Sequence, residues 1–472
     1  SYITTSANPS NYSALTASAW INFDNTTGRQ SVFSQYQDNT ASVSAMWMLW
    51  NVASNELWFF IIDSSNAFKT AKWTSSNSFT LTTGNWYNVV GVWDGSYVKV
   101  YVNGEVGSYS DAATSLNSSS LDFLIGSGPM ILGHGNEEVL DAIRTQLGEG
   151  LTFFTNNSKG VELAEEICNA VKCAEQIRFV SSGGEADMYA MRLARAHTGR
   201  NKILKFEGGY HGMSGDSLMS LAPNKMVNFP LAVPDSAGIP EAVRDDVLVA
   251  PFNDPQVATE IMNEYSDQIA GVIVEPLQRI NPPKTNFLEE LRLLCSSKGI
   301  ILIFDEIVTG FRFSYGGAQE YYGVTPDLCT LGKIIGGGFP LAAIAGKKEI
   351  MAHFDKEKVG SDGFLMQIGT LSGNPIASVA GLKTLEILRR PGSYEKLRQN
   401  GQRIMDFASK ELSENNIDFK VVGDQTLFEI IFTNEEILNY RDVQKNDLKI
   451  YSKFNQILKE NGVFKPIGKM YI

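Results

Sequence analysis

Two residues of this 472-residue chain stand where they could act on an aldehyde and on a heteroaromatic ring. Lys333 lies between an apolar run and the glycine-rich stretch 336–338. A lysine in an apolar, glycine-lined setting can have a lowered pKa and become a nucleophile toward aldehydes. Asp305 follows four apolar residues in the run ILIFDEI. A carboxylate buried there needs a cationic or protonated partner, and a protonated ring nitrogen would serve.

Two other segments could hold the remainder of such a ligand. Ser182, Gly183 and Gly184 close the run IRFVSS and open a helical pattern, where free backbone N–H groups make a phosphate cradle. Tyr210 and His211 follow the run KILKFEG, and an aromatic residue at a strand end can stack on a planar ring. Each feature alone is more often structural. Together with the acid and the lysine they predict a site for pyridoxal 5′-phosphate (PLP).

The elements that must position these residues are short apolar runs separated by helical patterns. The runs cover residues 177–182, 202–208, 247–251, 270–276 and 301–307. Helical patterns lie between them, for example over 185–198 and 287–297. Continuous apolar strands bounded by helices predict a mainly parallel sheet covered on both faces. Ligands of such sheets bind at the carboxyl ends of the strands, where the unusual residues gather.

The first 120 residues have a different composition. They hold all seven Trp and 47 Ser, Thr and Asn, but only four Lys and Arg. Apolar and polar residues alternate over 15–23, and Asp94-Gly95 and Asn103-Gly104 suit tight hairpin turns. We therefore predict a separate antiparallel β-sandwich ahead of the α/β part.

The charge balance and the cysteines exclude several classes of function. The chain has 40 Lys and Arg against 52 Asp and Glu, and the net charge of −12 argues against a nucleic-acid partner. No apolar run reaches membrane-spanning length, so we expect no membrane partner. Four Cys without a Cys-x-x-Cys pair predict neither a disulfide scaffold nor a metal site.

The N-terminal segment resembles a family of β-sandwiches. The runs TASAWINF and GNWYNVVGVWDGSYVKVYVNGEVGSY are similar to laminin-G/concanavalin-like jelly rolls, over about residues 1–126. The resemblance implies an all-β jelly roll that binds a glycan or a protein. Such modules are mostly extracellular.

The remainder resembles the class III PLP-dependent aminotransferases over about residues 121–472. Four segments carry the resemblance: FVSSGGEADMYAMRLARAHTGRNKILKFEGGYHG, VIVEPLQ, ILIFDEIVTGFRFSYGGAQEYYGVTPDLCTLGKIIGGGFPLAAIAG and GTLSGNPIASVAGLKTLEIL. Within the class they are most similar to the glutamate-1-semialdehyde 2,1-aminomutases. The resemblance implies the α/β PLP-dependent transferase fold type I (aspartate aminotransferase-like). It also implies a cytoplasmic homodimer acting on a small amino acid or amino-aldehyde.

The same resemblance implies roles for single residues. Lys333 would form the internal aldimine and carry the proton between substrate and cofactor carbons, while Asp305 would pair with the pyridinium nitrogen. The other implied cofactor contacts are Ser182, Gly183 and Gly184 on the phosphate with Thr370 from the partner subunit, Tyr210 and Ile307 on the two ring faces, His211 beside Tyr210, and Glu275 near the phenolic oxygen. Ser127 would lie at the substrate. No metal is implied.

The sequence departs from the family pattern in several places. Gly184 stands where the family usually has Thr, and the Trp that normally precedes Gly128 is missing. A jelly roll replaces the usual N-terminal segment, and the chain ends inside the expected small domain. We therefore predict domains over 1–126, 127–385 and an incomplete 386–472, and hypothesise that two fragments have been joined. The alternative function is a glycan- or protein-binding jelly roll attached to a catalytically impaired aminotransferase fragment.

Overall fold

The structure is a computed structural model of the chain. It describes residues 15–22, 29–35, 46–51, 56–62, 68–74, 77, 85–93, 96–109, 128–153, 155–460, 463 and 465–472. Two compact units make up the chain. The first takes in residues 1–125 and 458–463, and the second takes in residues 126–457 and 464–472.

The described strands of the first unit form two antiparallel sheets. One sheet has the strand order β1-β6-β7-β8 and the other β2-β3-β4-β5. Their bounds are β1 Leu15–Asn22, β2 Arg29–Gln35, β3 Met46–Asn51, β4 Glu56–Ile62, β5 Phe68–Trp73, β6 Trp86–Trp93, β7 Val98–Val102 and β8 Glu105–Tyr109.

The two sheets pack face to face, as the sequence pattern predicts. A Cβ added to Gly91 on β6 would lie only 2.4 Å from the ring of Phe59 on β4, so glycine permits this close approach. Asn103 and Gly104 form the turn between β7 and β8, with φ values of 50° and 85°. This turn is confirmed, because both residues adopt the left-handed conformation that a two-residue hairpin turn requires. The Asp94-Gly95 turn lies outside the described residues.

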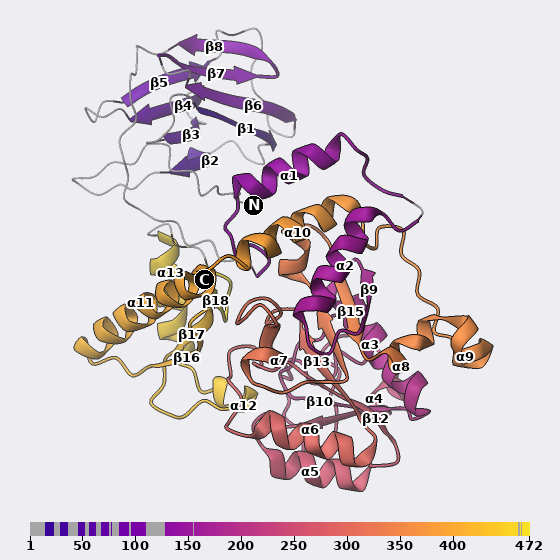
Figure 1. The fold of residues 1–472 in the computed structure, drawn as a ribbon. Helices are drawn as coiled ribbons and strands as arrows, with labels where there is room; N and C mark the ends of the chain where they lie inside the picture. Colours follow the sequence, from indigo (N-terminus) through magenta and orange to yellow (C-terminus); the bar gives the residue numbers. More distant parts are fainter. Residues whose placement is uncertain are drawn as a thin grey trace. The chain divides into compact units, whose positions relative to one another are not determined.

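The second unit is built on a seven-stranded sheet with the order β11-β10-β12-β13-β14-β15-β9 (Figure 1). The strands from β11 to β14 pair in parallel, and β15 pairs antiparallel with both β14 and β9. The mainly parallel sheet is therefore confirmed. The bounds are β9 Gln176–Val180, β10 Lys202–Phe206, β11 Val247–Ala250, β12 Ile269–Val274, β13 Ile301–Glu306, β14 Leu328–Leu331 and β15 Ala342–Gly346.

The central strands are apolar throughout because both faces of the sheet are covered. On β13, Ile301 and Ile303 pack into the core beneath α3 and α8, while Leu302 and Phe304 pack into the core on the opposite face. Alternation along the strand then sends Asp305 to the α3 face, beyond the last apolar residue. The carboxyl end of β13 is where this polar side chain enters the core.

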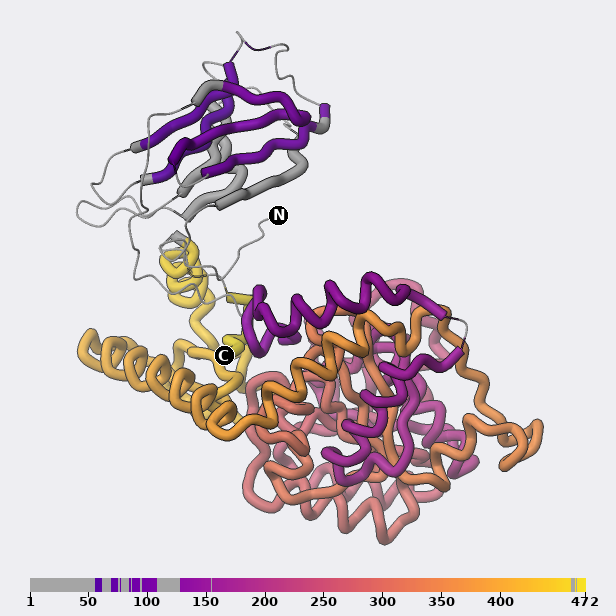
Figure 2. The backbone as a smooth tube through the Cα atoms, turned by 45° about the horizontal axis from the view of Figure 1, so that its top comes forward, coloured from indigo at the N-terminus to yellow at the C-terminus, as the bar shows by residue number. Residues whose placement is uncertain are grey.

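Helices cover the two faces of this sheet. Helix α1 lies alongside α10, and both views show the pair running together (Figure 2). The bounds are α1 Glu137–Leu147, α2 Ser158–Ala170, α3 Gly183–Thr198, α4 Glu241–Asp245, α5 Pro255–Glu264, α6 Phe287–Lys298, α7 Gly317–Tyr321, α8 Lys348–Met351, α9 Lys356–Gly363 and α10 Pro375–Leu388, with 3₁₀ turns η2 Lys333–Gly336 and η3 Ala352–Phe354.

The C-terminal residues form a small three-stranded sheet with the order β16-β17-β18. The buried carboxylate of Glu207, just after β10, receives two hydrogen bonds from Arg441 (2.7 and 3.0 Å) and so ties this part to the large sheet. The elements are α11 Ser393–Glu414, β16 Lys420–Asp424, β17 Leu427–Ile431, α12 Tyr440–Val443, α13 Leu448–Glu460 and β18 Met470–Tyr471. Within the described ranges, no helix is both long and apolar enough to cross a lipid bilayer.

A buried lysine fixes the segment that follows β10. The Lys205 ammonium donates to the carbonyl oxygens of Gly209 (3.2 Å), Ser217 (2.9 Å) and Met219 (2.6 Å). Burial lowers its pKa to about 7, while the carboxylate of Asp235 opposes the shift. The three acceptors bracket residues 210 and 211, so Lys205 holds in place the loop on which Tyr210 and His211 stand.

Replacing Lys205 with Met should destabilise the second unit. Three buried carbonyl oxygens would lose their donor, and each unsatisfied group costs about 1–3 kcal/mol. After allowance for the removed burial cost of the ammonium, we expect the free energy of unfolding in urea to fall by about 2 kcal/mol or more. Lys202→Met on the same strand is the control, because Lys202 donates one exposed hydrogen bond. Equal unfolding midpoints for Lys205→Met and the wild type would contradict the assigned role.

Candidate active site

The N-terminus of α3 presents backbone N–H groups at the carboxyl edge of the sheet. Ser182 caps the helix by accepting a hydrogen bond from the backbone N–H of Glu185 (3.3 Å). A Cβ added to Gly183 would lie 2.9 Å from Ile307, and one added to Gly184 would lie 3.0 Å from the backbone of Gly212. These two positions therefore leave little room for a side chain, and the first turn of α3 presents its backbone N–H groups where an anion would fit.

Asp305 and His211 form the central buried pair. Asp305 is 4% exposed, and its Oδ2 lies 2.8 Å from His211 Nδ1. Its other oxygen accepts a hydrogen bond from the backbone N–H of Ile307 (3.0 Å). Among the described residues, His211 Nε2 has no partner although it is fully buried. The pair is thus a carboxylate held in one orientation beside a polar atom that lacks a hydrogen bond.

Lys333 reaches the same region from the turn after β14. It adopts φ +46°, a conformation that L-residues rarely take, at the first position of η2. Burial lowers the pKa of its ammonium, and the negative charges of Asp305 and Glu275 oppose that shift. Strained backbone at a position that carries a reactive side chain is common at functional sites. The environment increases the fraction of the nucleophilic neutral amine.

Three further residues predicted from the sequence surround this centre. Glu275, after β12, accepts a hydrogen bond from the backbone N–H of Tyr210 (3.1 Å). Ile307 lies beside two glycines, since Cβ atoms added to Gly183 and Gly332 would approach it to 2.9 and 3.1 Å. The carboxyl ends of β10, β12 and β13 thus bring Tyr210, Glu275 and Ile307 to one edge of the sheet.

Asp187 is a buried acid that sequence reasoning missed. It lies on α3, and its Oδ1 accepts a hydrogen bond from Thr330 Oγ1 (2.6 Å). Burial, together with the nearby negative charge of Asp305, raises the pKa of Asp187 well above its ordinary range, which favours the neutral acid. A signal was available: Asp187 shares a helical face with the core residues Ala190 and Ala194, an unusual place for a charged side chain.

Ligand atoms of Asp187, His211 and Asp305 lie within 4.8 Å of one another, close enough to hold a metal ion. The existing hydrogen bonds and the neutral form favoured for Asp187 suit a protonated ring nitrogen better than a metal ion, whose carboxylate ligands must be deprotonated. The prediction that the site uses no metal remains a prediction.

A second buried residue that sequence reasoning missed is an arginine. It binds the backbone of Gly128, which packs against the Lys333 side chain. The fully buried Arg312 donates to the carbonyl oxygens of Gly128 (2.6 Å), Thr426 (3.3 Å) and Ile472 (3.2 Å). A Cβ on Gly128 would lie 2.6 Å from Lys333 Cδ, so glycine is needed there. In the sequence, Arg312 is marked only by its place in the GFR triplet that follows β13.

The structure does not test two of the predicted site residues. Thr370 is exposed in the turn before α10, and in the part of the chain that the structure describes no hydrogen bond joins it to the other site residues. Ser127 lies outside the described residues. Both predictions stay untested.

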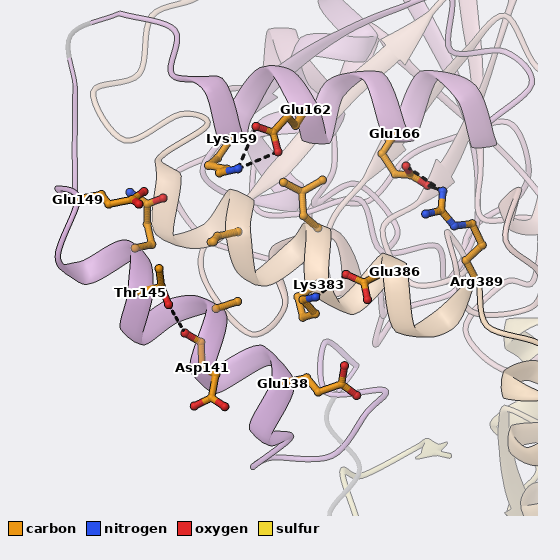
Figure 3. A pocket seen from close by; sticks show the side chains of 14 residues that line it. Glu138, Asp141, Thr145, Glu149, Lys159, Glu162, Glu166, Lys383, Glu386 and Arg389 are labelled. Carbon is orange, nitrogen blue, oxygen red and sulfur yellow. Dashed lines mark hydrogen bonds and ion pairs between the residues drawn. The ribbon is translucent and has the colours of Figure 1, made fainter.

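A wide surface groove of about 740 Å³ lies elsewhere, between α1, α2 and α10 (Figure 3). Its polar lining includes Glu138, Glu162, Glu166, Lys383 and Arg389, and most of these charges are paired with one another or with neighbours. None of the residues described above lines it, so the groove is separate from the Lys333 centre.

The centre fits a planar ring that carries a phosphate, an aldehyde and a ring nitrogen. The open N–H groups at the start of α3 suit the phosphate, and the unpartnered buried His211 Nε2 indicates that a polar group is accommodated nearby. Asp305 suits a protonated ring nitrogen, and Lys333 suits an aldehyde carbon. These are the groups of PLP, as the sequence predicts.

Family models match both parts of the chain. Residues 113–472 match the model of the class-III aminotransferases. Residues 1–142 match the model of the concanavalin A-like lectin/glucanases superfamily. The two matches overlap over residues 113–142.

Curated relatives and solved structures agree with the first match. The chain is 41% identical over 348 residues to a glutamate-1-semialdehyde 2,1-aminomutase of Methanococcus maripaludis, covering 73% of this chain and 79% of the relative. The corresponding enzyme of Methanococcus vannielii is 40% identical, with coverages of 73% and 80%. An omega-transaminase from Sphaerobacter thermophilus superposes with a TM-score of 0.68 at 33% identity, covering 78% of this chain and 82% of that one. A transaminase with PLP bound gives 0.67 at 28% identity, with coverages of 80% and 84%.

Proposed function

The chain belongs to the class-III aminotransferase family, and on that premise we propose that Lys333 and Asp305 carry its PLP-dependent amino-group transfer. Bound PLP supplies an aldehyde carbon that takes up the amino group and a ring that accepts the electrons released from the substrate. The chain's own residues bind the cofactor, orient it and move the protons.

In this proposal Lys333 is both the nucleophile and the proton carrier. Its amine has a lowered pKa through burial, so a larger fraction is neutral and able to attack the cofactor aldehyde. With the cofactor bound, Lys333 Nζ would be the group that takes the proton from the substrate carbon and returns it at the cofactor carbon. A lysine on a tight turn can make both transfers with a small movement of its side chain.

Asp305 keeps a proton on the ring nitrogen, and His211 fixes the orientation of Asp305 through the 2.8 Å contact. The N–H groups of Ser182, Gly183 and Gly184 bind the phosphate. Tyr210 and Ile307 would pack on the two ring faces, and Glu275 would lie near the phenolic oxygen. We further propose a homodimer in which Thr370 of the partner subunit reaches the phosphate, and a small amino acid or amino-aldehyde as substrate, bound near Ser127.

The observation that carries the proposal is the convergence of Lys333, Asp305 and the α3 N-terminus at one sheet edge. The test is the visible absorbance of the chain incubated with PLP and desalted. We expect a band that survives desalting and disappears when an amino donor such as alanine or glutamate is added. Absence of a band in the wild type would contradict the proposal and favour the alternative of an impaired fragment attached to a binding module.

A second candidate, 2,1-aminomutase activity, is supported by the 41% identity to an enzyme of that name. A mutase isomerises glutamate-1-semialdehyde without consuming a second amino compound, whereas an aminotransferase requires one. We expect this chain to need a separate amino acceptor, because the Trp that normally precedes Gly128 is missing. Isomerisation of glutamate-1-semialdehyde in an assay without any amino acceptor, at the rate of the full transamination, would contradict that expectation.

The first unit supports a separate proposal. Its match to the concanavalin A-like lectin/glucanases model favours binding of a glycan or a protein by residues 1–126. We also propose the boundaries 127–385 and 386–472 for the two catalytic domains. Retention of the full chain on immobilised glycans and release by free sugar would support the first of these proposals. The joining of two fragments and the cytoplasmic location stay predictions.

A further inference from the structure

Gly128 packs against the side chain of Lys333 and against the ring of Tyr471. A Cβ added to Gly128 would lie 2.6 Å from Lys333 Cδ, 3.0 Å from Lys333 Cε and 3.5 Å from the Tyr471 ring. Ordinary contacts between carbon atoms are about 3.5–4.0 Å long, so the Gly128 backbone leaves no space beside these two lysine carbons. The outer part of the Lys333 side chain is therefore confined by a segment that lies about 200 residues earlier in the chain.

Arg312 binds both of the groups that meet at this point. Its Nη2 donates to the carbonyl oxygen of Gly128 (2.6 Å), and its guanidinium carbon lies 5.0 Å from the centroid of the Tyr471 ring. Its Nη1 donates to the carbonyl oxygens of Thr426 (3.3 Å) and Ile472 (3.2 Å). One side chain thus joins the segment at Gly128 to the small C-terminal sheet.

Stability alone does not account for an arginine at this position. Arg312 is fully buried, its Nε has no hydrogen-bond partner, and burial lowers its pKa to about 10. Within the described ranges, no Asp or Glu carboxylate lies within ion-pair distance of its guanidinium. Burying a cation without an acidic partner is costly, and hydrogen bonds to neutral carbonyl oxygens offset only part of that cost. The titratable groups nearest to it are Tyr471, Tyr394 and Asp424.

We propose that Arg312 is a positioning residue that holds the Gly128 backbone and the Tyr471 ring in place and thereby fixes the amine of Lys333 at the carboxyl edge of the sheet. This rests on the proposed function, in which Lys333 is the reacting group. Lysine has a flexible four-carbon stem, so contact along its outer carbons removes much of its freedom before the reaction. Arg312 acts through Gly128 and Tyr471 and not on the reacting atoms.

Gly128→Ala tests the contact and leaves Arg312 unchanged. The added methyl group would lie about 1 Å inside the ordinary contact distance to Lys333 Cδ, so the lysine must move. Gly128 does not have a positive φ, so alanine adds no backbone strain and thermal unfolding should stay near that of the wild type. A displacement of about 1 Å can lower a rate about 10²-fold, and we expect that loss when an amino donor discharges the PLP absorbance band.

Competitive labelling with acetic anhydride tests the action of Arg312 on Lys333 in the PLP-free full chain. Only a neutral amine reacts, so the midpoint of labelling against pH, read by peptide mass spectrometry, reports the protonation of Lys333. Burial lowers the pKa of Lys333 and the charge of Arg312 lowers it further, against three opposing acids, Asp305, Glu275 and Asp187. Lys469 is the other cation that interacts with Lys333.

Arg312→Met should move the labelling midpoint of Lys333 to higher pH, because a nearby positive charge is removed. Arg312→Lys keeps the charge and should return the midpoint toward the wild-type value. Gly128→Ala should leave it unchanged. Arg398→Met is the matched control, because Arg398 donates to the carbonyl oxygen of Phe313 (2.6 Å) and, in the described part of the chain, binds neither Gly128 nor Tyr471.

The variants also separate positioning from folding. Arg312→Met leaves three carbonyl oxygens without their donor and should unfold at a lower temperature than the wild type. Gly128→Ala and Arg312→Lys keep the proposal testable if that variant does not fold. A lost rate in a Gly128→Ala chain of wild-type stability supports the proposal. A Gly128→Ala rate within twofold of the wild type, or a Lys333 midpoint that does not depend on the charge at position 312, would overturn it.

Failure of this proposal is distinguishable from failure of the proposed function. Labelling is measured without PLP, so it reports on Arg312 and Lys333 whether or not the absorbance band forms. A wild type without the band whose Lys333 midpoint still depends on Arg312 would contradict the proposed function and support the action of Arg312 on Lys333. A wild type with the band whose midpoint and rate are unchanged in the variants would do the reverse.

Discussion

Lys333→Ala lowers the rate of amino-group transfer by more than about 10⁴-fold, because one substitution removes both the nucleophile and the proton carrier. General acid–base catalysis alone contributes about 10²–10⁴-fold. The measurement is the single-turnover rate at which an amino donor discharges the PLP absorbance band. Lys348→Ala is the matched control, because Lys348 is an exposed lysine on the neighbouring α8.

Chemical rescue separates this role from an effect on folding. If Lys333 moves the proton, added methylamine should restore part of the Lys333→Ala rate in proportion to its concentration. A variant that had only misfolded would not respond. A Lys333→Ala chain that keeps a tenth of the wild-type rate would contradict the assignment.

Asp305→Asn should lower the transfer rate by about 10²–10³-fold, the size expected when a group that stabilises developing charge is removed. Asparagine keeps the shape of Asp305 but removes the negative charge that holds a proton on the ring nitrogen. His211 would lose its anionic partner at the same time. The single-turnover rate and the absorbance maximum of bound PLP should both change.

Asp187→Asn is the matched control for Asp305→Asn. Both acids are buried and near one another, but burial and the charge of Asp305 favour the neutral form of Asp187. An amide in place of a neutral acid changes no charge, so we expect a loss of less than about tenfold. A larger loss for Asp187→Asn than for Asp305→Asn would show that the two carboxylates had been assigned the wrong way round.

The sequence predicts the site residues that lie at strand ends. Lys333, Asp305, Tyr210 and Ser182 each come directly after an apolar run, and parallel strands carry their carboxyl ends to one edge. The strand over 301–307 could be recognised because both of its faces are buried. Glu275, which the family resemblance implies near the phenolic oxygen, follows β12 at the same edge and accepts a hydrogen bond from the backbone N–H of Tyr210.

The sequence does not predict groups whose role depends on tertiary contacts. Asp187 belongs to the site only because α3 lies across β14, where Thr330 donates to it. Nothing in the sequence indicates that Arg312 is buried, because its three acceptor carbonyl oxygens come from distant parts of the chain.

The most direct test of the proposed function is to identify the lysine that bonds covalently to PLP. Three buried or partly buried lysines have lowered pKa values, so each of them is a candidate for that bond. These are Lys205, Lys333 and Lys469. Borohydride adds hydride to the carbon of a C=N bond and leaves a stable amine, so reduction followed by peptide mass spectrometry identifies the lysine. The account predicts the label on Lys333 alone. A label on Lys205 or Lys469, or no label after PLP treatment, would contradict it.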